Sequence, residues 1–199
     1  FRGPNCTGVA SDTGTLPAEF SDTENVVWTL KLGDGIGCPV VAEGRVVTST
    51  MFGKDEIGLV AHDARTGEQL WERKWPVGDI DETHETNSYA STTPAIDGDR
   101  VYFYFWTLGL IAVDAKTGAD VWHKELPTPY FVFKWGAGMS PILYDDMVIF
   151  LQDDDLYPAI YAFDKATGDQ RWKDDRSDMA VNYSHPVICQ TDTGDELVV

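Results

Sequence analysis

The sequence predicts an all-β protein, a β-propeller made of four-stranded antiparallel blades. Three observations lead to this fold class. An eleven-residue pattern, A-x-D-x-x-T-G-x-x-x-W, occurs three times, at 61–71, 112–122 and 162–172. A Pro-apolar pair precedes each copy in phase, and no stretch of the chain shows a sustained helical period. Repeats of about 40 to 50 residues that hold four short strands are typical of propeller blades.

Each repeat is expected to begin at its Pro-apolar pair, which is Pro39-Val40, Pro94-Ala95 or Pro141-Ile142. A turn containing Gly or Asp follows, and then an apolar run. Asp-Gly and Thr-Gly dipeptides lie where tight hairpins need a positive φ. In the second repeat we therefore expect strands at about 93–96, 100–105, 109–114 and 119–125.

The recurring motif is expected to be architectural. Its Asp can accept hydrogen bonds from backbone N–H groups two or three residues on, its Thr adds a hydroxyl to the same turn, and its Gly supplies the positive φ. Its Trp falls on the outermost strand, where the ring can cover the seam to a neighbouring blade. Repetition in every blade favours this role over ligand binding. The motif residues are Asp63, Thr66, Gly67, Trp71, Asp114, Thr117, Gly118, Trp122, Asp164, Thr167, Gly168 and Trp172.

The repeats divide the chain into an N-terminal extension at 1–25 and propeller blades at 26–199. The segment 26–32 resembles an outer strand with its Trp, and we predict a donated strand that completes a last blade and removes a free edge. The chain then holds about three and a half blades of a longer propeller. Such an open fragment leaves blade faces uncovered, so we expect self-association. The expected blades are blade 1 at 37–75, blade 2 at 91–126, blade 3 at 138–174 and the start of blade 4 at 184–199.

Composition excludes several classes of function. The formal net charge is −18, which repels nucleic acid and anionic lipid and suits a cation or a basic partner. We expect no transmembrane segment, because no stretch approaches the roughly 20 apolar residues of a membrane helix. The three cysteines, Cys6, Cys38 and Cys189, lie far apart without a CxxC pair, so we expect neither a metal cluster nor a disulfide framework.

Candidate site residues lie on long loops that we expect to share one face of the propeller. Two of these loops offer oxygen ligands suited to Ca²⁺ but lack the spacing of an EF-hand, so a solvated acidic loop is the favoured interpretation. His84 beside Glu82 and Glu85 is a candidate zinc or base site without a second histidine at metal spacing. The acidic candidates are Asp79, Asp81, Glu82, Asp153, Asp154 and Asp155.

The densest aromatic stretch is Tyr130, Phe131, Phe133 and Trp135. Aromatic side chains on a rim favour contact with a partner or a carbohydrate, and packing between blades is the alternative. The sequence contains no G-x-S-x-G, P-loop or H-E-x-x-H motif. We therefore assign no catalytic residue and no metal site.

The three motif copies resemble the repeats of quinoprotein-like propellers, a superfamily that includes PQQ-dependent alcohol dehydrogenases and the bacterial outer-membrane assembly lipoprotein. The opening residues 1–8 also resemble an R-G-P-x-x-x-G stretch often found ahead of such propellers. The resemblance implies a propeller of seven or eight blades. It also implies a periplasmic or other extracytoplasmic location in the bacterial envelope.

The resemblance leaves the activity open, because a fold does not determine a function. Dehydrogenase members hold PQQ and Ca²⁺ at a site with a vicinal Cys-Cys disulfide, and this sequence has no adjacent cysteines. We therefore predict a non-catalytic scaffold, without a cofactor, that binds a protein partner or a small-molecule ligand on its loop face. The alternatives are a PQQ- and Ca²⁺-dependent alcohol or sugar dehydrogenase, and a carbohydrate-binding or hydrolase-associated propeller.

Overall fold

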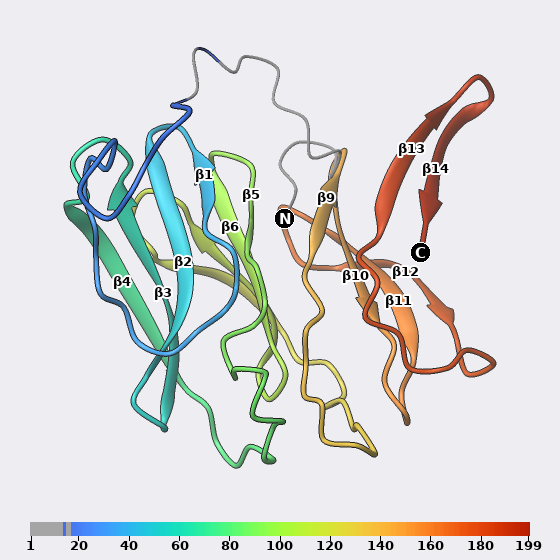
Figure 1. Ribbon diagram of the computed structural model, residues 1–199. Coiled ribbons are helices and arrows are strands. Elements are labelled where there is room, and N and C mark those ends of the chain that lie inside the picture. Colours follow the sequence, from blue (N-terminus) through green and yellow to red (C-terminus); the bar gives the residue numbers. More distant parts are fainter. Residues whose placement is uncertain (1–13, 15–16) are drawn as a thin grey trace.

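The protein is all-β in the computed structural model, which describes residues 14 and 17–199 (Figure 1). The strands form three four-stranded antiparallel sheets and one two-stranded hairpin. In each large sheet the strands lie side by side in chain order. This arrangement confirms the predicted fold of four-stranded antiparallel blades.

The strand bounds define the blades. Blade 1 contains β1 (Val40–Ala42), β2 (Arg45–Phe52), β3 (Glu56–Asp63) and β4 (Gln69–Pro76). Blade 2 contains β5 (Ala95–Ile96), β6 (Arg100–Phe105), β7 (Gly109–Asp114) and β8 (Asp120–Lys124). Blade 3 contains β9 (Ile142–Tyr144), β10 (Met147–Gln152), β11 (Ala159–Asp164) and β12 (Gln170–Asp175). The hairpin of β13 (Val187–Thr191) and β14 (Gly194–Val198) begins a fourth repeat.

The three four-stranded blades pack face to face around one shared hydrophobic core. The short first strands β1, β5 and β9 contact one another in succession, and the fourth strand of each blade lies at the opposite edge of its sheet. The middle strands of blade 2 are buried on both faces because a blade covers them on each side. On β6, the Phe103 ring stacks on Trp75 of blade 1 with the ring centroids 6.4 Å apart. The next residue, Tyr104, has its ring centroid 4.2 Å from that of Phe150 in blade 3, with the two rings tilted. Because successive side chains of a strand point to opposite faces, β6 packs against both neighbouring blades.

The segment 26–32, predicted as a donated strand, forms no strand in the structure and pairs with no sheet. The predicted pairing was with a last blade that lacks an outer strand of its own. Each four-stranded sheet among the described residues already has its own outer strand, β4, β8 or β12. The aromatic residue of the segment still has a defined place, because the Trp28 indole N–H donates to the Ala64 carbonyl at 3.0 Å.

Candidate functional site

The repeated motif builds the same turn in all three blades. In blade 2 the Asp114 Oδ1 accepts hydrogen bonds from the backbone N–H of Lys116 at 3.0 Å, from the N–H of Thr117 at 2.8 Å and from the Thr117 hydroxyl at 2.8 Å. Gly118 closes the turn with a φ of +70°. Asp63 and Asp164 accept the equivalent backbone bonds in the other blades. In each blade the motif Asp therefore accepts the backbone N–H groups two and three residues on.

These hydrogen bonds favour the ionised carboxylate. The hydrogen bond from the Thr66 backbone is the largest cause that lowers the pKa of Asp63 below its ordinary value. The Thr117 hydroxyl is the main cause for Asp114, and the Arg171 guanidinium for Asp164. All three aspartates thus serve the turn as charged acceptors.

Two of the three motif Trp residues, Trp71 and Trp122, join their blade to the turn of the next blade. The Trp71 indole N–H donates to the Ala115 carbonyl at 3.0 Å, and that of Trp122 donates to the Lys165 carbonyl at 2.9 Å. The rings lie against the turn glycines, since a Cβ on Gly118 would come within 2.7 Å of the Trp71 ring. No such turn lies beside Trp172 among residues 17–199, and its side chain is 37% exposed.

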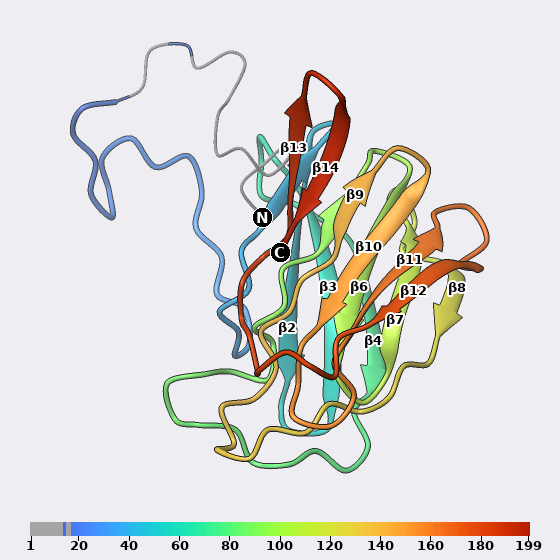
Figure 2. The same cartoon turned by 90° about the vertical axis from the view of Figure 1, so that its right-hand side faces the viewer.

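The long loops after the fourth strands gather at one end of the blades. Residues 77–94 and 125–141 lie together at the lower end of the molecule in both views (Figures 1 and 2). His84 N–H donates to the Lys134 carbonyl at 2.8 Å, and the Asn87 side chain donates to the Trp135 carbonyl at 2.7 Å. The fold thus brings together two loops about 50 residues apart in sequence, both of which carry predicted site residues.

His84 is part of this loop contact. Its ring lies 4.4 Å from the Trp135 ring, and its Nδ1 is 2.8 Å from the Thr86 hydroxyl. In the part of the chain that the structure describes, no group of three or more His, Cys, Asp or Glu side chains is placed to hold a metal ion. The hydrogen bonds and the ring contact give His84 a role in holding the loops together.

The expectation of a solvated acidic loop at 153–155 is wrong for two of its three carboxylates. Asp153 is fully buried, and its two oxygens accept hydrogen bonds from the Arg176 guanidinium at 2.8 and 3.0 Å. Asp154 is also buried and accepts from the Gln152 amide and from three backbone N–H groups. Buried charges need such partners, and the sequence pattern does not reveal Arg176 as one. Only Asp155 is exposed.

Exposed apolar side chains lie on this acidic loop and on the segment bonded to it. Phe133 is the most open of them, at 76% exposure. The two segments involved are hydrogen-bonded to each other, because Asp155 N–H donates to the Tyr130 carbonyl at 2.9 Å and Val132 N–H donates to the Asp155 carboxylate at 2.8 Å. We call this surface the apolar rim; its members are Tyr130, Val132, Phe133, Trp135, Leu156 and Tyr157.

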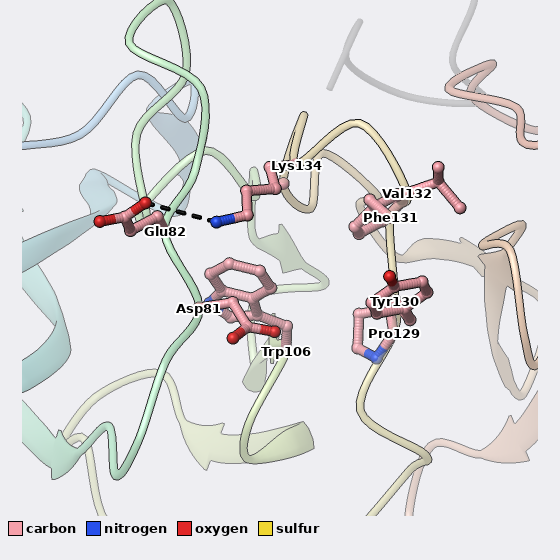
Figure 3. Close-up of a pocket in the computed structure, with 9 residues that line it drawn as sticks. Asp81, Glu82, Trp106, Pro129, Tyr130, Phe131, Val132 and Lys134 are labelled. Atoms are coloured by element: carbon pink, nitrogen blue, oxygen red, sulfur yellow. Dashed lines mark hydrogen bonds and ion pairs between the residues drawn. The ribbon is translucent and has the colours of Figure 1, made fainter.

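A pocket of about 120 Å³ opens beside the apolar rim (Figure 3). Asp81, Glu82 and Lys134 lie on one side of it and Pro129, Tyr130 and Phe131 on the other. Trp106 lies beside Asp81, facing Tyr130 and Pro129, and is only 6% exposed. Its indole N–H is buried and has no acceptor among the described residues.

Trp106 was not among the residues predicted from sequence. It directly follows the apolar run 101–105, at the turn between the second and third strands of blade 2. An aromatic residue at that turn falls on the loop face, which is the pattern that could have identified it. Lys134 was also not predicted, because a single lysine in an aromatic stretch does not indicate a site unless its spatial neighbours, such as Glu82, are known.

Two further features concern the cysteines and the membrane. Cys38 and Cys189 are free thiols, and Cys6 lies outside the described residues. Residues 14 and 17–199 include no helix that could span a membrane.

Comparison with known proteins gives matches at the level of sequence. A family model described as outer membrane protein assembly factor BamB matches residues 6–130. Quinohemoprotein alcohol dehydrogenase ADH IIB of Pseudomonas putida is 26% identical over 185 residues, which cover 86% of this chain and 26% of that protein. The chain therefore spans about a quarter of the length of this relative.

Similar solved structures agree on the fold. Quinohemoprotein alcohol dehydrogenase ADHIIG from Pseudomonas putida HK5 matches with a TM-score of 0.50 and 21% identity, over 72% of this chain and 21% of that one. A europium-containing methanol dehydrogenase matches with a TM-score of 0.51 and 15% identity, over 72% of this chain and 25% of that one. At these identities the likeness shows the propeller fold alone.

Proposed function

This chain belongs to the PQQ-like propeller repeat family whose model is described as outer membrane protein assembly factor BamB, and on that premise we propose that it is a non-catalytic scaffold that binds protein partners. The partner would contact the loop face of the propeller. The family description points to the bacterial cell envelope as the location. The chain supplies no catalytic group to this function.

The observation that carries the proposal is the apolar rim. Monomeric proteins rarely expose contiguous apolar patches without a binding role, and aromatic side chains are enriched in protein interfaces. Four of the six rim residues are Tyr, Phe or Trp. A surface of this composition suits a protein partner.

The rim is also held in place before a partner arrives. The buried Asp154 carboxylate accepts the N–H groups of Leu156 at 2.8 Å and Tyr157 at 2.9 Å, which positions these two exposed side chains. Phe131, behind the rim, stacks on Tyr183 at 5.8 Å. Because a rigid surface loses less conformational entropy on binding, this support favours affinity.

Site-specific photo-crosslinking tests the proposal. A benzophenone amino acid at Phe133 of the full-length protein, expressed in its own host, should give a discrete crosslink to one envelope protein. Val41 is the control, because it is similarly exposed but lies near the β1–β2 turn, at the other end of the strands from the loop face. Equal crosslinking from both positions, or none from Phe133, would exclude a partner on the rim.

A second candidate function is favoured by the 26% identity to a quinohemoprotein alcohol dehydrogenase. The residues of this chain do not fit the cofactors that such a function implies, since the sequence has no adjacent cysteines and the buried carboxylates of the loop face already have partners. Calorimetric titration of the full-length protein with PQQ and Ca²⁺ distinguishes the two functions. We expect no saturable binding; one-to-one binding followed by dye-linked alcohol oxidation would replace the scaffold proposal.

A further inference from the structure

The pocket beside the rim has an unpaired negative charge. The Asp81 carboxylate makes no hydrogen bond or ion pair with the described residues, although it lines the pocket (Figure 3). Glu82 has one partner, the Lys134 ammonium at 3.4 Å, and both of these side chains are largely exposed. An exposed pair of this kind contributes little stability and can exchange for another partner. The pocket therefore has two carboxylates and one cation.

The opposite side of the pocket is aromatic. Tyr130, Phe131 and Pro129 face Trp106 across the opening (Figure 3). The space of about 120 Å³ is well below the roughly 300 to 1,000 Å³ of pockets that take a whole drug-sized molecule. It suits a single inserted side chain.

We propose that this pocket binds an arginine side chain presented by a peptide segment of the protein partner. The inference rests on the proposed scaffold function and names the chemistry that the partner must bring. The guanidinium group would stack between the aromatic side chains and pair with the Asp81 carboxylate. Neighbouring apolar residues of the same segment would lie on the apolar rim.

Arginine fits the pocket better than other cations do. Its guanidinium is planar and weakly hydrated, so it stacks on aromatic faces and pairs with a carboxylate through two parallel hydrogen bonds. A metal ion would need a third ligand, and the described residues offer no such group. A peptide also brings backbone carbonyls, which can supply the acceptor that the buried Trp106 N–H lacks.

The charge of the whole chain favours the same partner. A net charge of −18 attracts basic segments over a distance of about 8 to 10 Å at ordinary salt and speeds their association. Lys134 is the competing cation in the pocket, because it pairs with Glu82. Removing this lysine should therefore strengthen binding, which distinguishes an arginine pocket from a nonspecific apolar contact.

The test is a titration of the full-length protein with the peptide acetyl-Gly-Arg-Gly-amide, followed by the indole N–H resonance of Trp106 in NMR spectra. A Trp106→Phe variant assigns that resonance. We expect a saturable shift with the arginine peptide, and binding about tenfold weaker with the uncharged citrulline peptide, because the charged hydrogen bonds are lost. Raising the salt concentration should weaken the arginine peptide alone.

Variants give the direction of each contribution. Asp81→Asn should weaken the arginine peptide about fivefold or more, and Lys134→Gln should strengthen it about twofold. Asp79→Asn is the matched control, because Asp79 is an exposed carboxylate of the same loop that does not line the pocket, and it should change the affinity little.

Three results would overturn the arginine proposal. One is no response of Trp106 to the peptide, the second is an equal response to the citrulline peptide, and the third is a response to methyl glucoside in place of the peptide, which would indicate a saccharide site. The outcome is separable from that of the scaffold proposal. Crosslinking from Phe133 without peptide binding would support the scaffold proposal and reject the arginine pocket. Peptide binding without a crosslink would support the pocket and reject a partner on the apolar rim.

Discussion

Asp114 illustrates how one carboxylate organises a turn of this fold. Its Oδ1 accepts three hydrogen bonds from residues two and three positions on. The side chain is half-buried, and the hydrogen bonds from those donors favour its charged form and lower its pKa. Asp63 accepts the same three bonds, whereas Asp164 accepts the two backbone bonds and the Thr167 hydroxyl donates to Asp169 instead.

The motif aspartates should contribute stability that depends on pH. Their pKa values are lowered in the folded state, so the contribution is present above the unfolded pKa of about 3.9 and is lost as the pH falls through the folded value. Asp114→Asn keeps an acceptor that does not titrate. The difference in free energy of unfolding between the wild type and this variant should be larger at pH 6 than at pH 3.

Urea unfolding at the two pH values measures this difference. Asp99→Asn serves as a control, since Asp99 is an exposed aspartate whose carboxylate makes no hydrogen bond or ion pair with the described residues. A difference for Asp114→Asn that stayed the same from pH 6 to pH 3 would show that the carboxylate charge does not stabilise the turn.

At the scale of elements, the seam between blades is built from a Trp and a Gly. The Trp71 ring on β4 covers the Gly118 turn that follows β7, and its N–H donates to the carbonyl of Ala115 in that turn. Trp28 and Trp122 repeat the contact at Gly67 and Gly168. The glycine is thus needed twice, for its positive φ and for the space that the ring occupies.

Gly118→Ala and Gly44→Ala separate these two needs. Both glycines have a positive φ, +70° and +74°, but a Cβ on Gly44 would meet nothing within 4 Å. Gly44→Ala should lower the free energy of unfolding by about 1 to 2 kcal/mol through backbone strain alone. Gly118→Ala should lower it by about 1 to 3 kcal/mol more, because the methyl group displaces the Trp71 ring.

Chemical denaturation of the two variants gives both values. Near-ultraviolet circular dichroism should show an altered tryptophan environment for Gly118→Ala only. Equal losses of stability in the two variants would mean that the ring contact adds nothing to the seam.

At the scale of the molecule, the stacked blades bury the strands of the middle blade and leave the last strands exposed to solvent. Blade 2 lies between two blades and is the most buried, whereas β12 is exposed along its whole length. The β13–β14 hairpin pairs with no other strand among the described residues. Its apolar residues Ile188 and Leu197 are only partly buried against blade 3.

This 199-residue chain, prepared alone, should therefore self-associate, because open strand edges and apolar blade faces pair readily with other copies. Light scattering over a range of protein concentrations measures the effect. The apparent mass should rise with concentration, and more so at high salt, where repulsion between chains of −18 net charge is screened. A single monomeric mass throughout would contradict this prediction.

The sequence by itself determined the blades. The period of the A-x-D-x-x-T-G-x-x-x-W motif predicts four strands per repeat and places Asp, Thr, Gly and Trp at their turn and outer strand, because each of these roles depends on neighbours a few residues away. The net charge and the cysteine spacing likewise limit the classes of function that the sequence favours.

Only the tertiary structure decided what lies on the loop face. In the folded chain Asp153 is buried and paired with Arg176, and His84 lies against Trp135. Trp106 and Tyr130 line the same pocket. The tertiary structure also left 26–32 outside any sheet while keeping Trp28 in its seam. These contacts join residues up to about 50 positions apart. Local sequence propensity does not tell which distant side chain will pair with a charged group or pack on an aromatic ring.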